Sequence, residues 1–249
     1  VESAREHNPL GMDALYRLGG ETIDCVIRNP DGFIWHLNTS DQGESLLKYS
    51  IRAAIWATVF GCHAGFPRQE IEHLFVGTLL ADIGMAKYPP EFVAKRGPFT
   101  RKEYLNYQKH VGIGVDILRI EGNVDAQVLS IVRSHHERHD GRGFPRGKQG
   151  DQISTLARVA HLAYSYERLL KCTSESDLSP ATAISRLYKQ RKIKFAEQLV
   201  FEFIKALGMF PAGSVVELST GEVGIVTEQN QNQRLTPKIT IVTTARKKL

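Results

Sequence analysis

The chain has 249 residues, of which 42% are hydrophobic and 24% are charged. This composition is typical of a soluble globular domain and excludes a disordered chain. No run approaches about 18 consecutive apolar residues, which excludes a membrane-spanning helix. The 32 basic and 27 acidic side chains leave a net charge of +5, but the basic residues are scattered, which argues against nucleic-acid binding.

The N-terminal segment, VESAREHNPLG, lacks the apolar stretch of a signal peptide. The three cysteines, Cys25, Cys62 and Cys172, are widely spaced and form no CxxC pair. We therefore expect reduced thiols and a cytoplasmic location. The chain starts at an internal-looking Val1 and ends in ARKKL, as a fragment of a larger sensor or regulator would.

Residues 1–43 are expected to form an appendage to the main domain. MDALYRL, at 12–18, predicts a short helix. CVIRNPDGFIWHL, at 25–37, is apolar on both sides of Asn29-Pro30-Asp31-Gly32, a strong turn signal. This segment predicts a β hairpin.

Residues 44–211 carry apolar side chains at helical spacing, as in the series Ile71, Phe75, Leu79 and Ile83. Residues 212–249 change to short β-type runs, SVVEL, EVGIVTE and KITIVTT, which predict a β meander. The predicted fold is therefore mainly α, with small β elements at the N-terminus and a C-terminal β extension.

Three histidines, His135, His136 and His139, lie within five positions in the segment SHHERHDGRGFPRG. A structural explanation exists, because the end of a helix favours His and Arg. It explains the adjacent pair poorly, since neighbouring residues point about 100° apart on a helix. The pair suits two ligands that reach one ion from a helix end, or one ligand beside a packed histidine. The HExxH zinc motif is not met, because Asp140 stands where its second histidine would be.

Two further residues are weaker candidates when taken alone. Asp82 ends an apolar stripe in TLLADIGM, so its carboxylate must be paired, coordinated or at the edge of the core. A lone Asp near a helix end is more often capping or solvated. His110, in YQKHVGIGVDIL, faces inward with Tyr107 and Gly114, where a core histidine with satisfied hydrogen bonds is the commoner explanation.

Taken together, these segments form a pattern specific enough to indicate one protein family. HHERHDGRGFP, preceded by LLADIGM and followed by ISTLARVA, resembles the HD-GYP family of bacterial cyclic di-GMP phosphodiesterases. The resemblance spans roughly residues 44–226 and includes stretches at Lys95–Glu103 and His110–Leu118. It implies an HD-domain-like helical bundle that hydrolyses a cyclic dinucleotide with two or three metal ions, usually iron or manganese.

The chain departs from the family pattern at several ligand positions. Tyr49 stands where the family carries a ligand histidine, and Ala81 replaces the histidine of the His-Asp pair. The family's later aspartate falls at Ala163-Tyr164-Ser165, where no residue is acidic. The extra glutamate of three-metal members would fall near Ser45.

Positions that the resemblance assigns to substrate also differ. Met85 replaces a phosphate-binding lysine, and residues 172–178, CTSESDL, contain none of the family's basic residues. Phe144 replaces the tyrosine of the GYP motif, which keeps the ring and loses the hydroxyl. Because dinucleotide phosphates favour Arg and Lys contacts, these changes argue against tight cyclic di-GMP binding.

Four ligand positions survive: Asp82, His110, His135 and His136. The resemblance implies that the lost positions mostly serve one metal and the survivors its neighbour. Tyr and Ala do not replace His and Asp as iron or manganese ligands, and two-ion hydrolysis needs both ions. We therefore expect at most a single divalent ion, of iron, manganese or zinc, and no two-metal catalysis.

The leading hypothesis is a degenerate HD-GYP-type signalling domain without hydrolytic activity that acts as a regulatory or protein-interaction module. In the family, the GYP loop is understood to contact GGDEF-type cyclase domains. Here that loop is Arg142, Gly143, Phe144, Pro145 and Arg146. An exposed Phe144 between two arginines would suit an interface anchor. The alternative is a structural turn that packs Phe144 into the domain.

Two other hypotheses remain open. In the first, the surviving ligands support a single-metal cyclic di-GMP phosphodiesterase, which predicts turnover that is lost in His135→Ala. In the second, the chain is a cyclic di-GMP receptor that binds without cleavage. The loss of the basic contacts argues against the second.

Overall fold

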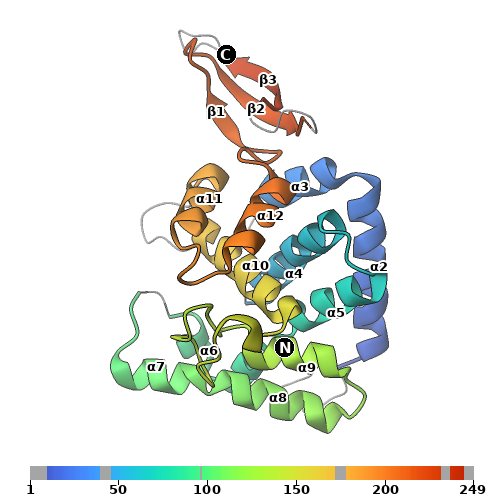
Figure 1. Ribbon diagram of the computed structural model, residues 1–249, viewed down its shortest axis with the longest axis vertical. Helices are drawn as coiled ribbons and strands as arrows, with labels where there is room; N and C mark the ends of the chain where they lie inside the picture. The colour runs from blue at the N-terminus through green and yellow to red at the C-terminus, as the bar shows by residue number, and fades with distance from the viewer. Residues whose placement is uncertain (1–9, 40–45, 96, 172–177, 231–235, 244–249) are drawn as a thin grey trace.

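The computed structural model describes residues 10–39, 46–95, 97–171, 178–230 and 236–243. A helical bundle forms the body, and a small sheet projects from one end (Figure 1). The elements in chain order are α2 (Met12–Arg28), α3 (Pro30–Thr39), α4 (Leu46–His63), α5 (Arg68–Leu79), η1 (Ile83–Lys87), α6 (Pro90–Val93), α7 (Arg101–Gln108), α8 (His110–Glu121), α9 (Ala126–Ser134), η2 (Gly150–Gln152), α10 (Thr155–Lys171), α11 (Pro180–Lys189), α12 (Glu197–Leu207), β1 (Val215–Glu217), β2 (Val223–Glu228) and β3 (Lys238–Thr243). The mainly α fold is confirmed.

The predicted N-terminal β hairpin is wrong, because the two expected strands at 25–37 are helical and belong to α2 and α3, which are separated only by Asn29. The supposed turn is a helix start. Pro30 is the first residue of α3, where its missing N–H costs nothing, and the Asn29 side chain accepts a hydrogen bond from the backbone N–H of Gly32 at 2.9 Å. The short helix expected at 12–18 also extends to Arg28. Both helices bury apolar side chains in the main core, which includes Ile34.

The helix α4 lies at the centre of the bundle and packs against α5 and α10. The buried small residues of α4, which include Ala54, Ala57 and Gly61, allow these neighbouring helices to approach closely. A buried ion pair crosses this contact, with Arg52 Nε donating to Glu167 at 2.7 Å. The same carboxylate accepts from Trp56 Nε1 at 2.8 Å, and the Arg52 guanidinium also donates to the Leu37 carbonyl. These bonds join α3, α4 and α10.

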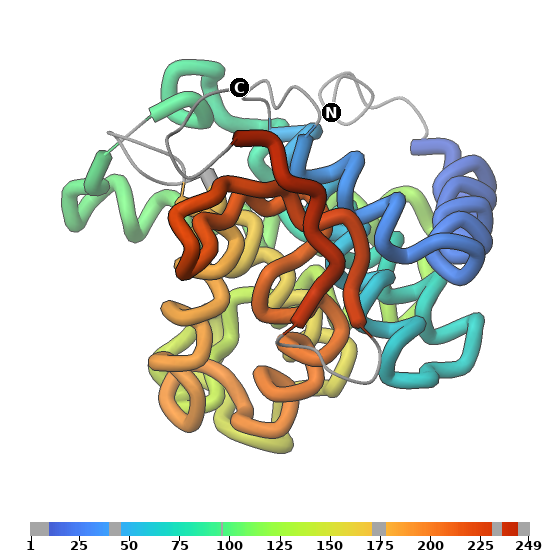
Figure 2. The backbone as a smooth tube through the Cα atoms, turned by 90° about the horizontal axis from the view of Figure 1, so that it is seen from above, coloured from blue at the N-terminus to red at the C-terminus, as the bar shows by residue number. Residues whose placement is uncertain are grey.

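The C-terminal β meander is confirmed as a three-stranded antiparallel sheet in the order β1-β2-β3. Viewed from above, the strands lie across the end of the bundle (Figure 2). Val226 is fully buried against the body. Hydrogen bonds to α3 fix the sheet, with Asn38 Nδ2 donating to the Ala212 carbonyl at 2.8 Å and Gln229 N–H to Asp31 at 3.1 Å.

Two expectations about the chain as a whole are tested in part. Among the described helices, none has the length and apolar character needed to cross a membrane. Cys25 and Cys62 are free thiols, and Cys172 lies outside the described residues.

Candidate metal-ligand cluster

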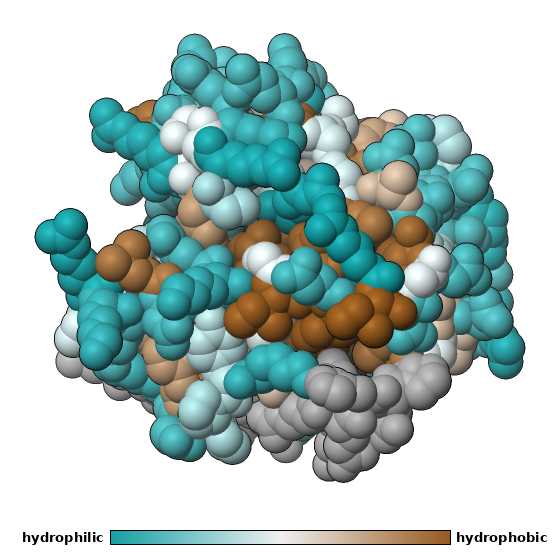
Figure 3. Space-filling model, turned by 90° about the horizontal axis from the view of Figure 1, so that it is seen from below, coloured by the Kyte–Doolittle hydropathy of each residue, from teal (hydrophilic) through white to brown (hydrophobic). Residues whose placement is uncertain are grey.

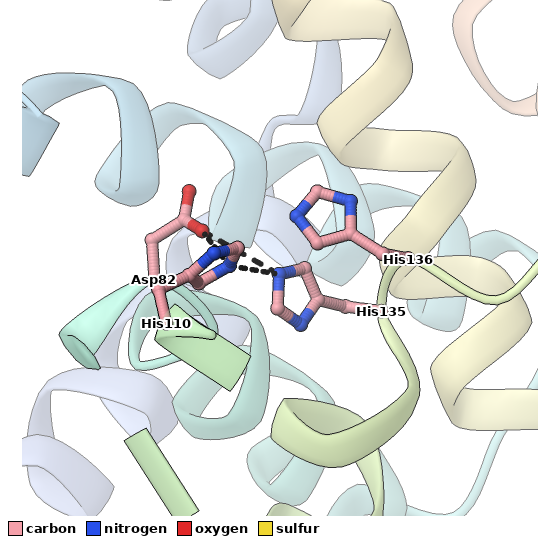
Figure 4. A group of neighbouring side chains, drawn as sticks. All are labelled: Asp82, His110, His135 and His136. Atoms are coloured by element: carbon pink, nitrogen blue, oxygen red, sulfur yellow. Dashed lines mark hydrogen bonds and ion pairs between the residues drawn. The ribbon is translucent and has the colours of Figure 1, made fainter. Parts of the chain in front are cut away.

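The four surviving positions, Asp82, His110, His135 and His136, lie together where three helical segments meet (Figure 4). Asp82 lies between α5 and η1, His110 is the first residue of α8, and the two adjacent histidines directly follow α9. One ligand atom of each residue lies within 4.8 Å of the others. The chain therefore brings one carboxylate and three imidazoles into a single group.

Two glycines allow Asp82 to reach His110. A Cβ on Gly84 would overlap the carbonyl oxygen of His110 and the backbone nitrogen of Gly114. A Cβ on Gly114 would in turn crowd Ile83 and the nitrogen of Gly84. Only glycine permits this close crossing of η1 and α8.

Backbone carbonyls orient two of the imidazoles. His110 Nδ1 lies 2.5 Å from the Tyr107 carbonyl oxygen, and His135 Nδ1 lies 2.8 Å from the Val132 carbonyl. A carbonyl only accepts, so each Nδ1 must carry the proton and donate it. In the neutral rings the Nε2 atoms then present lone pairs, which is the tautomer that binds metal.

These lone pairs converge on one carboxylate oxygen. Asp82 Oδ1 lies 3.0 Å from His110 Nε2 and 3.4 Å from His135 Nε2, and the two nitrogens are 3.5 Å apart. Among the described residues, no donor hydrogen bonds to this buried oxygen. Three acceptors at such distances require a shared cation, either a metal ion or a proton.

The charge state of Asp82 fits that requirement. Burial works against the charged form, but hydrogen bonds and positive charge from His110 and His135, which these rings supply only when the shared cation is a proton on the facing Nε2, hold the pKa of this carboxyl well below its usual value. The carboxylate is therefore ionised at neutral pH. A buried anion surrounded by imidazoles is chemically suited to a divalent ion.

His136 lies at the edge of the cluster. Its Nε2 is 3.1 Å from the Tyr107 hydroxyl, and its ring stacks on Phe144 with 4.4 Å between ring centroids. Burial, followed by the neighbouring His135, lowers the pKa of His136 well below its usual value, so the ring stays neutral. Sequence reasoning assigned no role to Tyr107, whose only signal was its place three residues before His110.

The three positions where the family resemblance implies lost ligands also lie together. Tyr49, Ala81 and Tyr164 form a small cluster with Ala53, beside the ligand group. Tyr49 donates to the Tyr164 carbonyl at 2.9 Å, and the Tyr164 hydroxyl lies 3.1 Å from Ser50 Oγ. Burial raises the pKa of both tyrosines well above the usual value, so they remain neutral phenols. We call this group the tyrosine half of the site, and the Asp82 group the ligand half.

Hydrogen bonds to a buried carboxylate hold the loop that follows His136. The Glu137 carboxylate is 2% exposed and accepts hydrogen bonds from the backbone N–H of Arg146 and Lys148, at 2.8 and 2.9 Å. A Cβ on Gly143 would overlap the backbone at residues 136–138, so only glycine fits there. The loop therefore has a single well-supported path.

Phe144 differs from the expected exposed anchor. Its ring is only partly exposed and packs on His136, with Tyr104 and Tyr107 at 6.1 Å. Arg142 and Arg146 on either side are exposed. The ring covers the edge of the ligand half, while the arginines face outward.

The third histidine of the motif lies away from the cluster. His139 lines a small cavity with His161, Arg158 and Lys194. His161 Nδ1 donates to the His135 carbonyl at 2.7 Å, so it fixes the turn that carries His135 and His136. Sequence reasoning missed this residue. Its place on one helical face of ISTLARVAHLA predicts burial but no partner.

The remaining positions named from the sequence are either outside the described residues or buried. Ser45 and residues 172–177 are outside the described residues. Met85, at the expected phosphate-binding position, is 5% exposed and belongs to the interior.

Comparison with known proteins decides the family. A family model described as HD domain matches residues 39–199, which is more than half of the chain. The chain belongs to the HD domain family. Among relatives of this HD domain, the cyclic di-GMP phosphodiesterase PA4108 of Pseudomonas aeruginosa is 28% identical over 230 residues, 92% of this chain and 55% of the relative. The response regulator RpfG of Xanthomonas campestris, named as a cyclic di-GMP phosphodiesterase, is 30% identical over 129 residues, 51% of this chain and 34% of the relative.

A solved structure shares the fold. Bd1817, described as an HDG"Y"P protein from Bdellovibrio bacteriovorus, superposes with a TM-score of 0.68 at 18% identity, covering 81% of this chain and 66% of the other. The match to the HD domain model and the curated relatives support the resemblance seen in the sequence, and the solved structure shows that the fold is shared. The chain spans about half the length of PA4108 and a third of RpfG.

Proposed function

We propose that this HD domain is a degenerate HD-GYP module of cyclic di-GMP signalling that does not hydrolyse the dinucleotide and works by interaction. The observation that carries the proposal is the tyrosine half. Tyr49, Ala81 and Tyr164 occupy positions where the family pattern implies ligands, and they pack with Ala53 as an apolar unit.

The chemistry of that unit opposes a second ion. Hydrolysis with two ions requires them about 3.5–4 Å apart, one to generate hydroxide and one to hold developing charge. Ala81 offers no donor atom. The two phenols have raised pKa values, and the Tyr164 carbonyl already accepts a hydrogen bond from Tyr49. None of them supplies an anionic or imidazole ligand at neutral pH.

The ligand half fits one divalent ion. Asp82, His110 and His135 present converging lone pairs, and His136 stands at the edge. Iron, manganese or zinc suits an imidazole and carboxylate set of this kind. Such an ion would supply Lewis-acid polarisation of a phosphoryl oxygen, which keeps a single-metal phosphodiesterase as the second candidate function.

The proposed interaction surface is the loop Arg142–Arg146. Glu137 and Gly143 support a single path for it, and the two arginines are exposed. Arginines beside a partly exposed aromatic ring are typical of binding hot spots. GGDEF-type cyclase domains are the candidate partners. Tight binding of cyclic di-GMP itself is not proposed, because Met85 is buried where a lysine would be needed.

Metal content and turnover on the same sample test the proposal. Protein purified without chelator is expected to hold up to one equivalent of iron, manganese or zinc and to leave cyclic di-GMP intact. His135→Ala should lose the ion. His139→Ala is the matched control, because His139 belongs to the same motif but lies outside the ligand group. Two bound ions with turnover would overturn the proposal, and one ion with turnover that His135→Ala abolishes would select the single-metal enzyme.

The interaction surface has a separate test. Arg142→Ala together with Arg146→Ala removes both exposed charges and leaves the Phe144–His136 stack intact. Binding to a purified GGDEF-type domain is expected to weaken at least tenfold, while metal content stays unchanged. Arg119→Ala, an exposed arginine on α8, is the control. Equal binding by all three proteins would mean that the loop is only a turn.

A further inference from the structure

A small polar cavity lies beside the loop that follows His136. It differs from the lower face of the molecule, where the space-filling view shows apolar side chains gathered at the centre (Figure 3). The cavity has a volume of about 10 Å³ and is lined mainly by that loop, by α10 and by the turn between α11 and α12. Its polar lining residues are Glu137, His139, Arg158, His161 and Lys194. Three separate segments of the chain therefore place hydrogen-bonding groups around one small space.

Three nitrogen atoms on these lining residues are buried without a protein partner. They are His139 Nδ1, Arg158 Nε and His161 Nε2, and among the described residues none makes a hydrogen bond to them. Buried polar groups in proteins are almost always hydrogen bonded, either to the protein or to ordered water. Three such atoms around one cavity therefore indicate a shared ligand inside it.

The neighbouring hydrogen bonds define what two of these atoms offer. The Arg158 guanidinium donates from one terminal nitrogen to Asp151, at 2.9 Å, and from the other to Thr155, at 3.2 Å. Its Nε–H is the remaining donor, because a guanidinium has no acceptor. His161 Nδ1 donates to the His135 carbonyl, so in the neutral ring Nε2 is an acceptor. The ligand must therefore accept from Arg158 and be able to donate to His161.

We propose that this cavity holds one ordered water molecule, which accepts from Arg158 Nε and bonds to His161 Nε2 and His139 Nδ1. A cavity needs roughly 10–15 Å³ to hold one water. A volume of about 10 Å³ thus leaves no room for a phosphate, a carboxylate or another polyatomic ion. Three nitrogen partners match the roughly three hydrogen bonds that a buried water makes. Because water both donates and accepts, the fit holds for either tautomer of His139 and does not depend on the charge of His161.

The water joins α10 to the loop of the proposed interaction surface. His161 holds the His135 carbonyl through Nδ1, and the water fixes the other nitrogen and with it the orientation of the ring. Glu137 lines the same cavity and accepts from the backbone N–H of Arg146 and Lys148. The site therefore supports both the turn at His135 and the path of the loop. It is independent of the proposed function, because it needs neither an ion nor a partner protein.

A crystal structure of the chain, at a resolution that shows ordered water, tests the site directly. One peak is expected within about 2.7–3.2 Å of both Arg158 Nε and His161 Nε2. Crystals soaked in bromide should show no anomalous peak at this place. A cavity without a peak, a direct hydrogen bond between Arg158 and His161, or an anomalous bromide peak would each overturn the proposal.

A matched pair of variants tests the site in solution. Arg158→Lys keeps the positive charge beside Asp151 and removes the Nε–H donor. Relaxation dispersion of water deuterons, which detects water molecules held inside a protein, should lose the contribution of one long-lived water in this variant. Arg119→Lys, at an exposed arginine on α8, removes the same donor away from the cavity and should leave the dispersion unchanged. Equal dispersion from the two folded variants would contradict a water held by Arg158.

Discussion

The ligand half and the tyrosine half lie side by side in one site, yet their polar groups are satisfied in different ways. In the ligand half, Asp82 and two imidazole nitrogens all present acceptors to one another and need a cation between them. In the tyrosine half, Tyr49 donates to a backbone carbonyl and the Tyr164 hydroxyl meets Ser50, so each buried hydroxyl finds a protein partner.

The difference separates ion binding from structural support. A cluster of acceptors is stable only with a cation, and its lone pairs remain available for one. A pair of neutral phenols with hydrogen bonds needs no ion and gains from apolar packing. One half therefore offers a candidate metal site, and the other stabilises the fold at the same place in the bundle.

Replacing the tyrosine half with ligands should have the largest effect. The triple variant Tyr49→His, Ala81→His and Tyr164→Asp supplies two imidazoles and a carboxylate beside Asp82. Its metal content is expected to rise to two ions per chain, with cyclic di-GMP hydrolysis appearing where the parent has none. Elemental analysis and product chromatography measure both.

The control for this variant is Tyr49→Phe with Tyr164→Phe, which keeps the apolar packing and adds no ligand. It should hold no more metal than the parent. A folded triple variant that still binds a single ion would contradict the assignment of these positions as former ligands.

The second largest effect is expected at the buried ion pair between Arg52 and Glu167, which joins α4 and α10. Glu167→Gln leaves the buried Arg52 guanidinium without its anionic partner. Removal of one partner of a buried pair costs about 3–5 kcal/mol, so the free energy of unfolding in urea should fall by that amount. Glu72→Gln, which weakens an exposed pair with Arg68, should cost less than about 1 kcal/mol. Equal losses in the two variants would argue against the role of the Arg52 network.

Sequence patterns predicted the helical body and the meander, because spacing and residue type carry those signals. The family resemblance named Asp82, His110, His135 and His136 as candidate ligands, and the fold brings these four side chains together. The hairpin at 25–37 failed, since Asn-Pro-Asp-Gly serves both as a turn and as a helix start. The choice depends on the burial of Ile34, which only packing decides. The contacts of Tyr107 and His161 depend on how α7 and α10 lie against the turn after α9, and no local pattern records that arrangement.

A pH-dependent effect is expected at Lys194, next to the tyrosine half. Its ammonium lies 3.1 Å from Ser165 Oγ, and burial, with smaller contributions from Arg168 and Arg138, lowers its pKa from 10.5 to about 8. The unfolded chain therefore binds more protons than the folded chain between about pH 8 and 10.5. Stability should rise with pH across this window.

Lys194→Met removes that group and keeps most of its volume. The difference in urea stability between parent and variant should shift in favour of the parent as the pH increases from 8 to 10. Lys205→Met, an exposed lysine on α12, should show a difference that does not change with pH. A constant difference for Lys194→Met as well would mean that its pKa is not lowered in the fold.

The smallest effect is expected for Tyr49→Phe, which tests whether the tyrosine half is only structural. The change removes one hydrogen bond, from the Tyr49 hydroxyl to the Tyr164 carbonyl, and keeps the ring contact of 5.3 Å. The loss should be about 1 kcal/mol in the free energy of unfolding. Metal content should not change, because Tyr49 supplies no ligand to the Asp82 group. A loss of bound metal would show that the phenol takes part in ion binding, and the two halves would then act as one site.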